Sequence, residues 1–432
     1  PEALKHLALT LRAKGFVPIV ASPADGPQKE ILSKLNIKTF VNPSIYRDNY
    51  VVENINKFAF VVVNTIVGAP LIKRLNGMNI PVVWWVHEAK AVYSDVQLQY
   101  MPLELQNNIY VYCVGDYAKN ILTEYRPRYE CKQMMYYVPD FSEESILAKD
   151  VKFAFPSGKK IFAIIGSKED RKGQDVLVEA IKLLDEKVRQ GSCFLFVGRC
   201  LDKNIYDVIE KAQGIFSDSI LNIDEIDRAS IINLYQHIDC LICASRDDPM
   251  PVVITEAMIF SKIVICSENT GYAPIIEKFN AGYVYKNNDA KELAGRITEV
   301  FYADGEILQV MAQQGRKIYE HYFSQGAADR SVNSLIANLQ CDEHKKSLME
   351  KVVSAKKRCA IYLYYNRRGI FEEYAQEAVQ GLATVGEKVL VVVNGLLNEE
   401  GENYIKENGF ELLVRENKGY DFGGYKDGIE HI

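Results

Sequence analysis

The chain has 432 residues, 48% of them hydrophobic, which predicts a globular protein of two to three domains. Its formal net charge of -6 argues against a nucleic-acid-binding protein, whose surface is expected to be basic. The sequence has no run of eighteen apolar residues and no signal-peptide pattern. The predicted location is therefore the cytoplasm, with any membrane association restricted to a peripheral one at the inner face of the plasma membrane.

The nine cysteines fall mostly within apolar, strand-like runs, as expected for small buried side chains in a reducing compartment. Cys240 and Cys243 form a CxxC pair inside "IDCLICAS". No second pair follows at zinc spacing, so the sequence predicts a buried strand and no metal site.

The first predicted element is a helix in "PEALKHLALTLRAKGF", where Leu4, Leu7, Ala8 and Leu11 form an apolar stripe. An α/β domain normally has a strand before such a helix, so we expect the first strand of this domain to be missing. Val-rich runs then predict strands buried on both faces, in residues 58–67, 80–88 and 109–115.

A polar, proline-containing stretch at about 137–160 precedes a second series of strand-like runs separated by amphipathic segments. These runs occupy residues 159–167, 192–200, 238–245, 261–268 and 281–285. The expected fold is α/β, with two Rossmann-like, doubly wound parallel-sheet domains facing a cleft, at 1–145 and 146–340. A charged segment at 341–358 then leads to a partial third α/β domain at 357–432.

Loops at the carboxyl ends of parallel strands are the expected ligand sites of such sheets. After the run ending near Gly166, the chain passes through Arg171, Lys172 and Gly173 before a predicted helix. A cation there can neutralise phosphate oxygens as a leaving group departs. When the loop is considered alone, a solvated lysine without a role is the favoured interpretation of Lys172.

The stretch "SRDDPMPVVITEAM" places Asp248 and Glu256 on either side of a turn built from Pro249, Met250 and Pro251. The prolines favour an extended turn and a helix that begins near Val252. Asp248 can then accept hydrogen bonds from sugar hydroxyls and Glu256 from ribose. A helix-dipole role explains Glu256 alone but not the pair. Gly271, between another strand and helix, allows backbone to approach a ligand.

The succession of Lys172-Gly173, "LFVGR", "DDPMPVVITEA", "NTGYAPII" and "AGYVY" resembles the family 4 retaining glycosyltransferases. The resemblance covers about residues 1–340 and implies the GT-B fold, a hexosyltransferase activity and a nucleotide-diphosphate sugar donor. It further implies that Lys172 contacts the diphosphate, Glu256 the ribose and Asp248 the transferred sugar. No cofactor is implied, and the departing phosphate helps to deprotonate the acceptor.

Three features depart from the family pattern. The first acid of the pair is usually glutamate, and Asp248 is one methylene shorter. The arginine expected five positions before the lysine is replaced by Ser167, and Arg171 is the candidate substitute. The glycine-rich loop after the first strand is expected to lie in the part missing before Pro1.

In the first domain, "WWVHEAK" places His87 and Glu88 at the end of a strand. The resemblance favours His87 as a ligand of the donor sugar, although a satisfied histidine at a strand end is the alternative. Glu88 is expected to cap the following helix, as is Asp116 after Gly115. A similar turn in "VNTIVGAP" carries Asn64, Thr65 and Gly68.

The end of the chain, "VRENKGYDFGGYKDGI", resembles the rhamnan synthesis F family of bacterial polysaccharide assembly. No glycine-rich loop, paired lysine or "HRD" accompanies its "DFG", so a kinase is excluded. Gly419, Gly423 and Gly424 with Asp421 predict either a tight turn or part of a sugar-nucleotide site.

The expected function is transfer of a sugar from a nucleotide sugar to a glycan or lipid-linked glycan acceptor of a bacterial cell-envelope polysaccharide. The rhamnan resemblance favours dTDP-rhamnose, while UDP and GDP donors remain open. Two alternatives are a nucleotide-sugar 2-epimerase of GT-B architecture and a non-catalytic sugar-nucleotide binding module. An epimerase needs several acids and histidines for proton transfer, and the chain has only six histidines.

Overall fold

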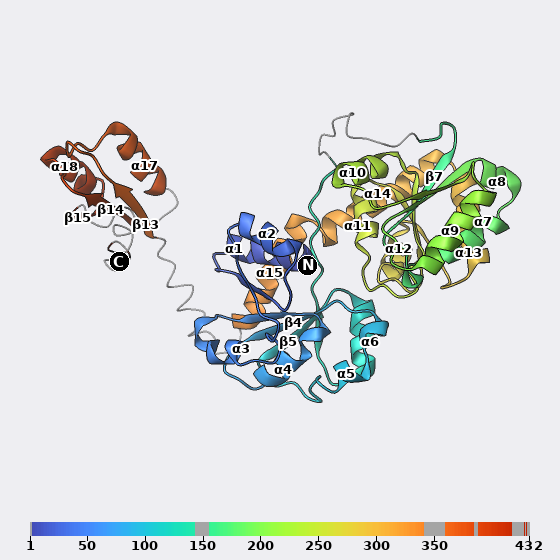
Figure 1. Cartoon of the computed structure of the whole chain (residues 1–432), viewed down its shortest axis with the longest axis horizontal. Helices are drawn as coiled ribbons and strands as arrows, with labels where there is room; N and C mark the ends of the chain where they lie inside the picture. Colours follow the sequence, from blue (N-terminus) through green and yellow to red (C-terminus); the bar gives the residue numbers. More distant parts are fainter. Residues whose placement is uncertain are drawn as a thin grey trace. The chain divides into compact units, whose positions relative to one another are not determined.

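The computed structural model describes residues 2–142, 155–340, 359–383 and 388–416, together with residues 427 and 429. The chain divides into two compact units, Pro1–Lys345 and Lys346–Ile432 (Figure 1). The predicted domain boundaries at residues 145, 340 and 357 lie in or beside stretches outside the described residues, so they remain predictions.

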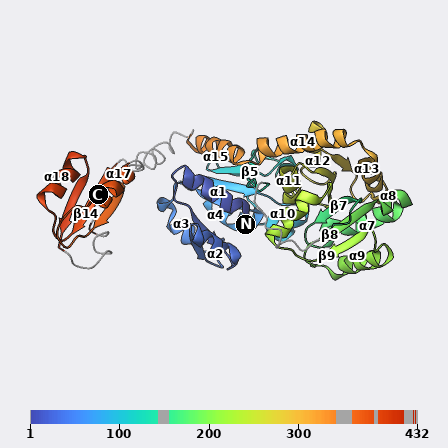
Figure 2. The ribbon, with the colours of Figure 1, turned by 90° about the horizontal axis from the view of Figure 1, so that it is seen from above.

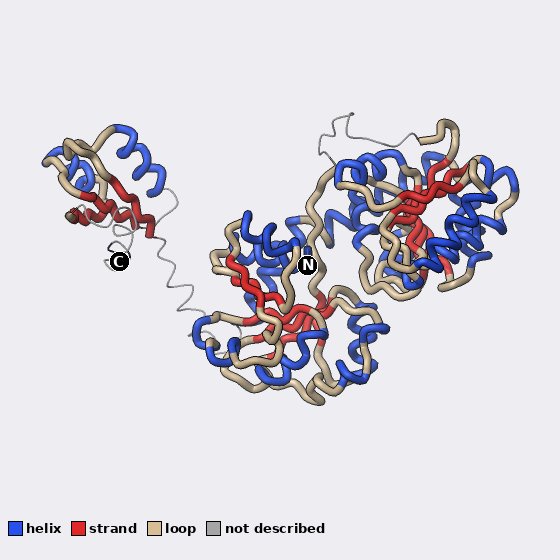
Figure 3. Tube along the Cα trace, in the orientation of Figure 1, coloured by secondary structure: helices blue, strands red, loops and turns tan. Residues whose placement is uncertain are grey.

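The first part of the larger unit contains short parallel strands in two sheets (Figure 3). One sheet has the order β3 (Val61–Asn64), β4 (Val82–Val86), β5 (Ile109–Cys113) and β6 (Cys131–Gln133), and β1 (Ile19–Ser22) pairs with β2 (Lys38–Val41). All five side chains of β4 are buried, as predicted for a strand covered on both faces. Three of the strands in these sheets match the predicted runs.

The helices of this part include the predicted first one, α1 (Glu2–Ala13), which buries Leu7, Ala8 and Leu11 on one face. The other α-helices are α2 (Pro27–Lys34), α3 (Tyr50–Glu53), α4 (Ala69–Leu75), α5 (Asp95–Leu98) and α6 (Asp116–Tyr125). Short 3₁₀ turns are η1 (Ile55–Lys57), η2 (Ile66–Gly68) and η3 (Lys90–Val92).

In the second part, six described strands form one parallel sheet, with the order β12-β11-β10-β7-β8-β9. They are β7 (Lys160–Ile165), β8 (Ser192–Val197), β9 (Ile220–Ile223), β10 (Cys240–Cys243), β11 (Ile263–Ser267) and β12 (Tyr283–Tyr285). The CxxC pair lies in β10, where all four side chains are buried, which confirms the predicted strand. In the part of the chain that the structure describes, no group of histidine, cysteine or acidic side chains is suited to holding a metal ion.

Helices cover both faces of this sheet, with α7, α9 and α13 on one side and α11, α12 and α14 on the other (Figure 1). Their bounds are α7 (Gln174–Leu183), α8 (Glu186–Gln190), α9 (Lys203–Ile215), α10 (Arg228–His237), α11 (Val252–Ile259), α12 (Ala273–Phe279), α13 (Ala290–Tyr302) and α14 (Gly305–Tyr322), with the 3₁₀ turn η5 (Asp170–Lys172). The core between sheet and helices includes Phe162, Ile181 and Ile242. Burying such a side chain contributes about 1.5–3 kcal/mol, which fixes the sheet that carries the loops.

The strand order has a consequence for ligand binding. From β7 the chain continues outward to β8 and β9, and it then returns to build β10, β11 and β12 on the other side. β7 and β10 are neighbours, with Cys240 opposite Phe162 and Leu241 opposite Ala163. The topological switch point therefore lies between β7 and β10, where open α/β sheets bind their ligands at the carboxyl ends of the strands.

The last helix of the larger unit is α15 (Gln325–Gln340), which lies beside α1 in both views (Figures 1 and 2). The predicted boundary at residue 340 assigns this helix to the second domain, and α15 contacts both α1 and α14. The amide of Val138 donates to the carbonyl of Phe323 over 3.0 Å. The two segments that cross between the sheets are thus hydrogen-bonded to each other.

The smaller unit contains a parallel sheet of three described strands, β13 (Cys359–Tyr364), β14 (Lys388–Asn394) and β15 (Glu411–Arg415). It is covered by α17 (Glu373–Ala383) and α18 (Glu399–Glu407), which agrees with the α/β structure predicted for this part of the chain. The cluster of Gly419, Asp421, Gly423 and Gly424 lies outside the described residues, so the rhamnan synthesis resemblance stays a prediction.

Candidate functional site

The loop that follows β7 has the predicted course from strand to helix. The 3₁₀ turn η5 ends at Lys172, and Gly173 precedes α7 with the left-handed φ of 68°. A Cβ atom at residue 173 would lie 2.1 Å from the carbonyl oxygen of Ala244. Only glycine allows this approach, and it brings the loop after β7 against the end of β10.

Lys172 and Asp248 meet at this contact. The Nζ of Lys172 lies 2.7 Å from Oδ2 of Asp248, and a guanidinium nitrogen of Arg171 lies 3.1 Å from the same oxygen. The Asp248 side chain is only 11% exposed, so this ion pair is much less accessible to water than a surface salt bridge. Arg171 and Lys172, both predicted to bind the donor, thus contact the same carboxylate oxygen at the switch point.

The loop around Asp248 is fixed from the other side by the loop after β11. The amide of Gly271 donates to the carbonyl of Asp248 over 3.1 Å, and the amide of Asp248 donates to Asn269. A Cβ atom on Gly271 would lie 1.7 Å from the carbonyl oxygen of Pro249. The three loops predicted to form the donor site therefore converge, and Gly271 is needed for the approach of two backbones.

Pro249, Met250 and Pro251 lead into α11, which begins at Val252 as predicted. Glu256 lies in the second turn of this helix, where the helix dipole has little effect on a carboxylate. The hydroxyl of Tyr235 donates to Glu256 Oε2 over 2.8 Å. Tyr235 is fully buried in α10 and has no motif around it, so sequence patterns could not identify it as the partner of Glu256.

His87 follows β4 and is mostly buried against Trp85, with 4.3 Å between the ring centroids. Burial lowers the pKa of His87 to about 3, so the imidazole is neutral at physiological pH. Its Nε2 atom is buried and has no hydrogen-bond partner among the described residues. The prediction of a fully satisfied histidine is therefore not supported, and a free ring nitrogen remains at the end of the strand.

Glu88 does not cap a helix, contrary to expectation. Its carboxylate accepts hydrogen bonds from the amides of His87, Ile66 and Glu88 itself and from the hydroxyl of Thr65. Burial nevertheless dominates and raises the pKa of Glu88 to about 7. The carboxylate connects the end of β4 to the turn after β3, where η2 begins, instead of capping the helix that follows Glu88.

Asp116 also differs from the expected helix cap. Gly115 occupies the N-cap position of α6, and Asp116 is the first helical residue. The Asp116 carboxylate accepts a hydrogen bond from the side-chain amide of Gln133 at the end of β6. A Cβ atom at Gly115 would lie 3.2 Å from the methyl group of Met250, so this turn faces the loop that leads into α11.

Asp247 joins the two parts of the larger unit and was not identified from the sequence. Its carboxylate accepts from the amide of Ala91 over 3.1 Å and from the hydroxyl of Tyr117 over 2.9 Å. Nothing in the motif distinguishes Asp247 from its neighbour Asp248. The structure separates them, because one carboxylate contacts the first part and the other contacts Lys172.

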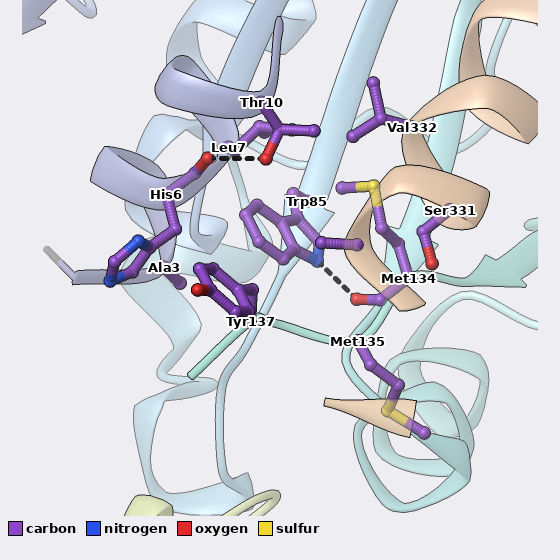
Figure 4. A pocket seen from close by; sticks show the side chains of 11 residues that line it. Ala3, His6, Leu7, Thr10, Trp85, Met134, Met135, Tyr137, Ser331 and Val332 are labelled. Atoms are coloured by element: carbon purple, nitrogen blue, oxygen red, sulfur yellow. Dashed lines mark hydrogen bonds between the residues drawn. The ribbon is translucent and has the colours of Figure 1, made fainter. Parts of the chain in front are cut away.

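A small pocket lies away from these loops, between α1, the segment after β6 and α15 (Figure 4). Trp85 forms one of its walls, and the indole nitrogen donates to the carbonyl of Met134 over 2.9 Å. Its volume of about 20 Å³ accommodates one or two water molecules. The pocket is too small for a sugar.

No helix among the described residues is both long and apolar enough to span a membrane.

Residues 146–318 match the profile of the family described as Glycosyl transferases group 1. The structure is similar to that of Anabaena Alr3699/HepE in complex with UDP and glucose, with a TM-score of 0.65 and 16% identity over 78% of this chain and 95% of that one. It is also similar to WaaG, a glycosyltransferase involved in lipopolysaccharide biosynthesis, with a TM-score of 0.57, 14% identity and coverage of 77% and 94%.

A segment of 90 residues is 29% identical to the putative colanic acid biosynthesis glycosyltransferase WcaL of Escherichia coli, which is 21% of this chain and 22% of that protein. The chain thus matches about a fifth of the length of its curated relatives. The similarity to solved structures shows the two-domain GT-B architecture. The profile covers the second of these two domains. The chain therefore has a GT-B-like fold, and its residues 146–318 match the glycosyl transferases group 1 profile.

Proposed function

We propose that the protein is a retaining glycosyltransferase that moves a sugar from a nucleotide-diphosphate sugar to a growing bacterial surface polysaccharide. The observation that carries the proposal is the Lys172–Asp248 pair, 2.7 Å apart at the switch point between β7 and β10. The group 1 profile covers both residues. The UDP and glucose bound by HepE support a nucleotide sugar as the donor.

The roles follow from the chemistry of each side chain. Lys172 and Arg171 provide the positive charge that stabilises the departing diphosphate, with Gly173 opening α7 toward it. Glu256 accepts hydrogen bonds from the ribose hydroxyls, and Asp248 and His87 orient the transferred sugar. The backbone of residues 249–252 and Gly271 lines the nucleotide. Reaction proceeds through an oxocarbenium-like centre, for which the protein supplies positioning and electrostatic stabilisation.

The names of two similar proteins indicate the class of acceptor. WcaL and WaaG are named for colanic acid and lipopolysaccharide biosynthesis, which favours a cell-envelope glycan acceptor, free or lipid-linked. A rhamnosyl donor depends on the rhamnan synthesis resemblance, whose glycine cluster lies outside the described residues. UDP-hexoses are therefore the first donors to test, with dTDP-rhamnose beside them.

The test is incubation of the whole protein with each nucleotide sugar and an envelope-glycan acceptor, followed by mass spectrometry of acceptor and donor. The proposal predicts a sugar added to the acceptor with release of nucleoside diphosphate. An epimerised nucleotide sugar without transfer would instead identify an epimerase. Donor binding with neither transfer nor hydrolysis would identify a non-catalytic module.

A further inference from the structure

Thr65 has a backbone conformation that is rare for a β-branched residue. Its φ is 75° and its ψ is 161°, a region in which glycine is almost the only residue without strain. Such a conformation costs about 1–3 kcal/mol and persists only where surrounding contacts determine it. The turn lies between β3 and η2, directly after Asn64.

Hydrogen bonds hold the backbone of Thr65 on both sides. Its amide donates to the carbonyl of Trp85 over 2.8 Å, and its carbonyl accepts from the indole nitrogen of Trp84 over 2.9 Å. Both tryptophans belong to β4 and are at most 2% exposed. The end of β3 is thereby attached to the most buried strand of the first sheet.

The side chain of Thr65 completes the arrangement. Its hydroxyl donates to the Glu88 carboxylate and accepts from the amide of Val67 over 3.2 Å. The same carboxylate accepts from the amides of Ile66 and His87, the latter over 2.9 Å. Glu88 is only 8% exposed, so its buried carboxylate needs these three donors and a fourth, its own backbone amide.

Two buried polar atoms flank the turn without a partner among the described residues, Oδ1 of Asn64 and Nε2 of His87. Asn64 is the last residue of β3, and His87 follows the last residue of β4. The Thr65 turn and the Glu88 carboxylate connect these two strand ends. The directions of both side chains therefore depend on the same set of hydrogen bonds.

We propose that Glu88 is a positioning residue that holds Thr65 in its strained conformation and thereby orients Asn64 and His87 at the carboxyl edge of the first sheet. The effect on catalysis rests on the proposed function, whereas the effect on the fold does not. Glu88 acts through the turn, and its proton is not transferred to a substrate.

The test is a double-mutant cycle of the whole protein, with the melting temperature as the first measurement. Glu88→Gln should lower it by several degrees, because the side-chain NH2 group of glutamine cannot accept hydrogen bonds, whereas both side-chain oxygens of glutamate can. Thr65→Gly should cost less than Glu88→Gln, because glycine adopts the same φ without strain and this relief offsets part of the loss of the hydroxyl. In the Thr65→Gly background, Glu88→Gln should cost less than half as much as in the wild type.

Thr65→Ala is the control that separates strain from the lost hydroxyl. It removes the same hydrogen bonds as Thr65→Gly but keeps a Cβ atom, so it should melt several degrees below the glycine variant. Glu53→Gln, at an exposed acid of the same part of the chain, should change nothing. If Glu88→Gln does not fold, recovery of a cooperative transition in the double variant supports the proposal.

The rate measurement then tests the positioning role. Glu88→Gln should reduce kcat by about 10-fold to 100-fold, the scale of a misplaced reacting group, with the donor KM unchanged. Thr65→Gly should restore most of that loss. Equal melting-temperature costs in both backgrounds would refute the proposal, as would a rate loss that glycine does not restore. A wild type without transfer activity would refute only the proposed function, because the melting cycle is independent of turnover.

Discussion

Lys172 is the single residue expected to contribute most to stabilising the departing diphosphate. Lys172→Ala should reduce kcat by about 100-fold to 1,000-fold, corresponding to about 2.7–4 kcal/mol for one lost electrostatic contact with developing charge. Stability should change little, because Arg171 still lies 3.1 Å from the Asp248 carboxylate. Steady-state kinetics and thermal melting measure the two effects. Lys182→Ala, at an exposed lysine of α7, is the matched control, and equal rates of the two variants would reject the role of Lys172.

Glu256 provides a prediction about binding. Glu256→Gln should weaken nucleotide affinity, since the amide oxygen replaces a charged acceptor and such bonds contribute about 1.5–3 kcal/mol. Tyr235→Phe should weaken it less, because it removes only the donor that orients the carboxylate. Isothermal titration with UDP measures both. Unchanged affinity in Glu256→Gln would leave that side chain with a structural role toward Tyr235.

Glu88 makes stability depend on pH. Its folded-state pKa of about 7 is raised by burial above the ordinary value of 4.5, so the folded protein binds an extra proton between these values. This contribution to stability is complete below about pH 4.5 and is lost as the pH rises through 7. Tyr46 and Tyr93, which face Glu88, have raised pKa values, and His87 with its pKa of about 3 stays neutral.

Melting curves at pH 6 and pH 8 test this linkage. The stability advantage of the wild type over Glu88→Gln should shrink by about 1 kcal/mol across that interval, because the glutamine variant has no group to titrate. A constant difference between the two proteins would contradict the raised pKa.

At the scale of elements, the loop between β7 and α7 depends on one glycine. Gly173→Ala should lower the melting temperature and abolish transfer, because a Cβ atom would meet the carbonyl oxygen of Ala244 at 2.1 Å and the φ of 68° disfavours alanine. Gly295→Ala in α13 is a control that should have the opposite effect on stability. No atom lies within 4 Å of its Cβ position, and alanine should stabilise the helix by about 0.5–1 kcal/mol. Equal melting temperatures for the two variants would show that the close approach is not required.

The sequence predicted the elements with strong patterns. Continuous apolar runs identified β4, β8 and β11, whose side chains are all buried. The strands β2, β6 and β9 have only three or four residues and include Lys38, Lys132 and Asn222, so no apolar run marked them.

The same contrast applies to the candidate site. Glycine and proline residues placed Lys172, Asp248 and Gly271 on loops that the structure brings together, because these two residue types mark the turns at strand ends. The contacts of Tyr235 and Asp247 and the positioning role of Glu88 depend on segments that are distant in the sequence. Local helix chemistry predicted caps at Glu88 and Asp116, and tertiary hydrogen bonds determined both instead.

For the larger unit, the proposed function requires a nucleotide sugar to bind at the switch point between β7 and β10. The first part of the larger unit contacts that edge through Asp247, which accepts from Ala91 and Tyr117. A donor held there would stabilise the whole unit Pro1–Lys345, since a ligand at a hundred times its dissociation constant adds about 2.7 kcal/mol to the free energy of unfolding.

The most direct measurement is the melting temperature of the wild type and of Lys172→Ala with a panel of UDP-hexoses, GDP-hexoses and dTDP-rhamnose. We predict that at least one nucleotide sugar raises the melting temperature of the wild type by several degrees, and that Lys172→Ala loses most of this shift while Lys182→Ala retains it. A shift with UDP-hexoses and none with dTDP-rhamnose would reject the rhamnosyl donor alone. No shift with any donor at millimolar concentration, or an equal shift in Lys172→Ala, would contradict the site itself.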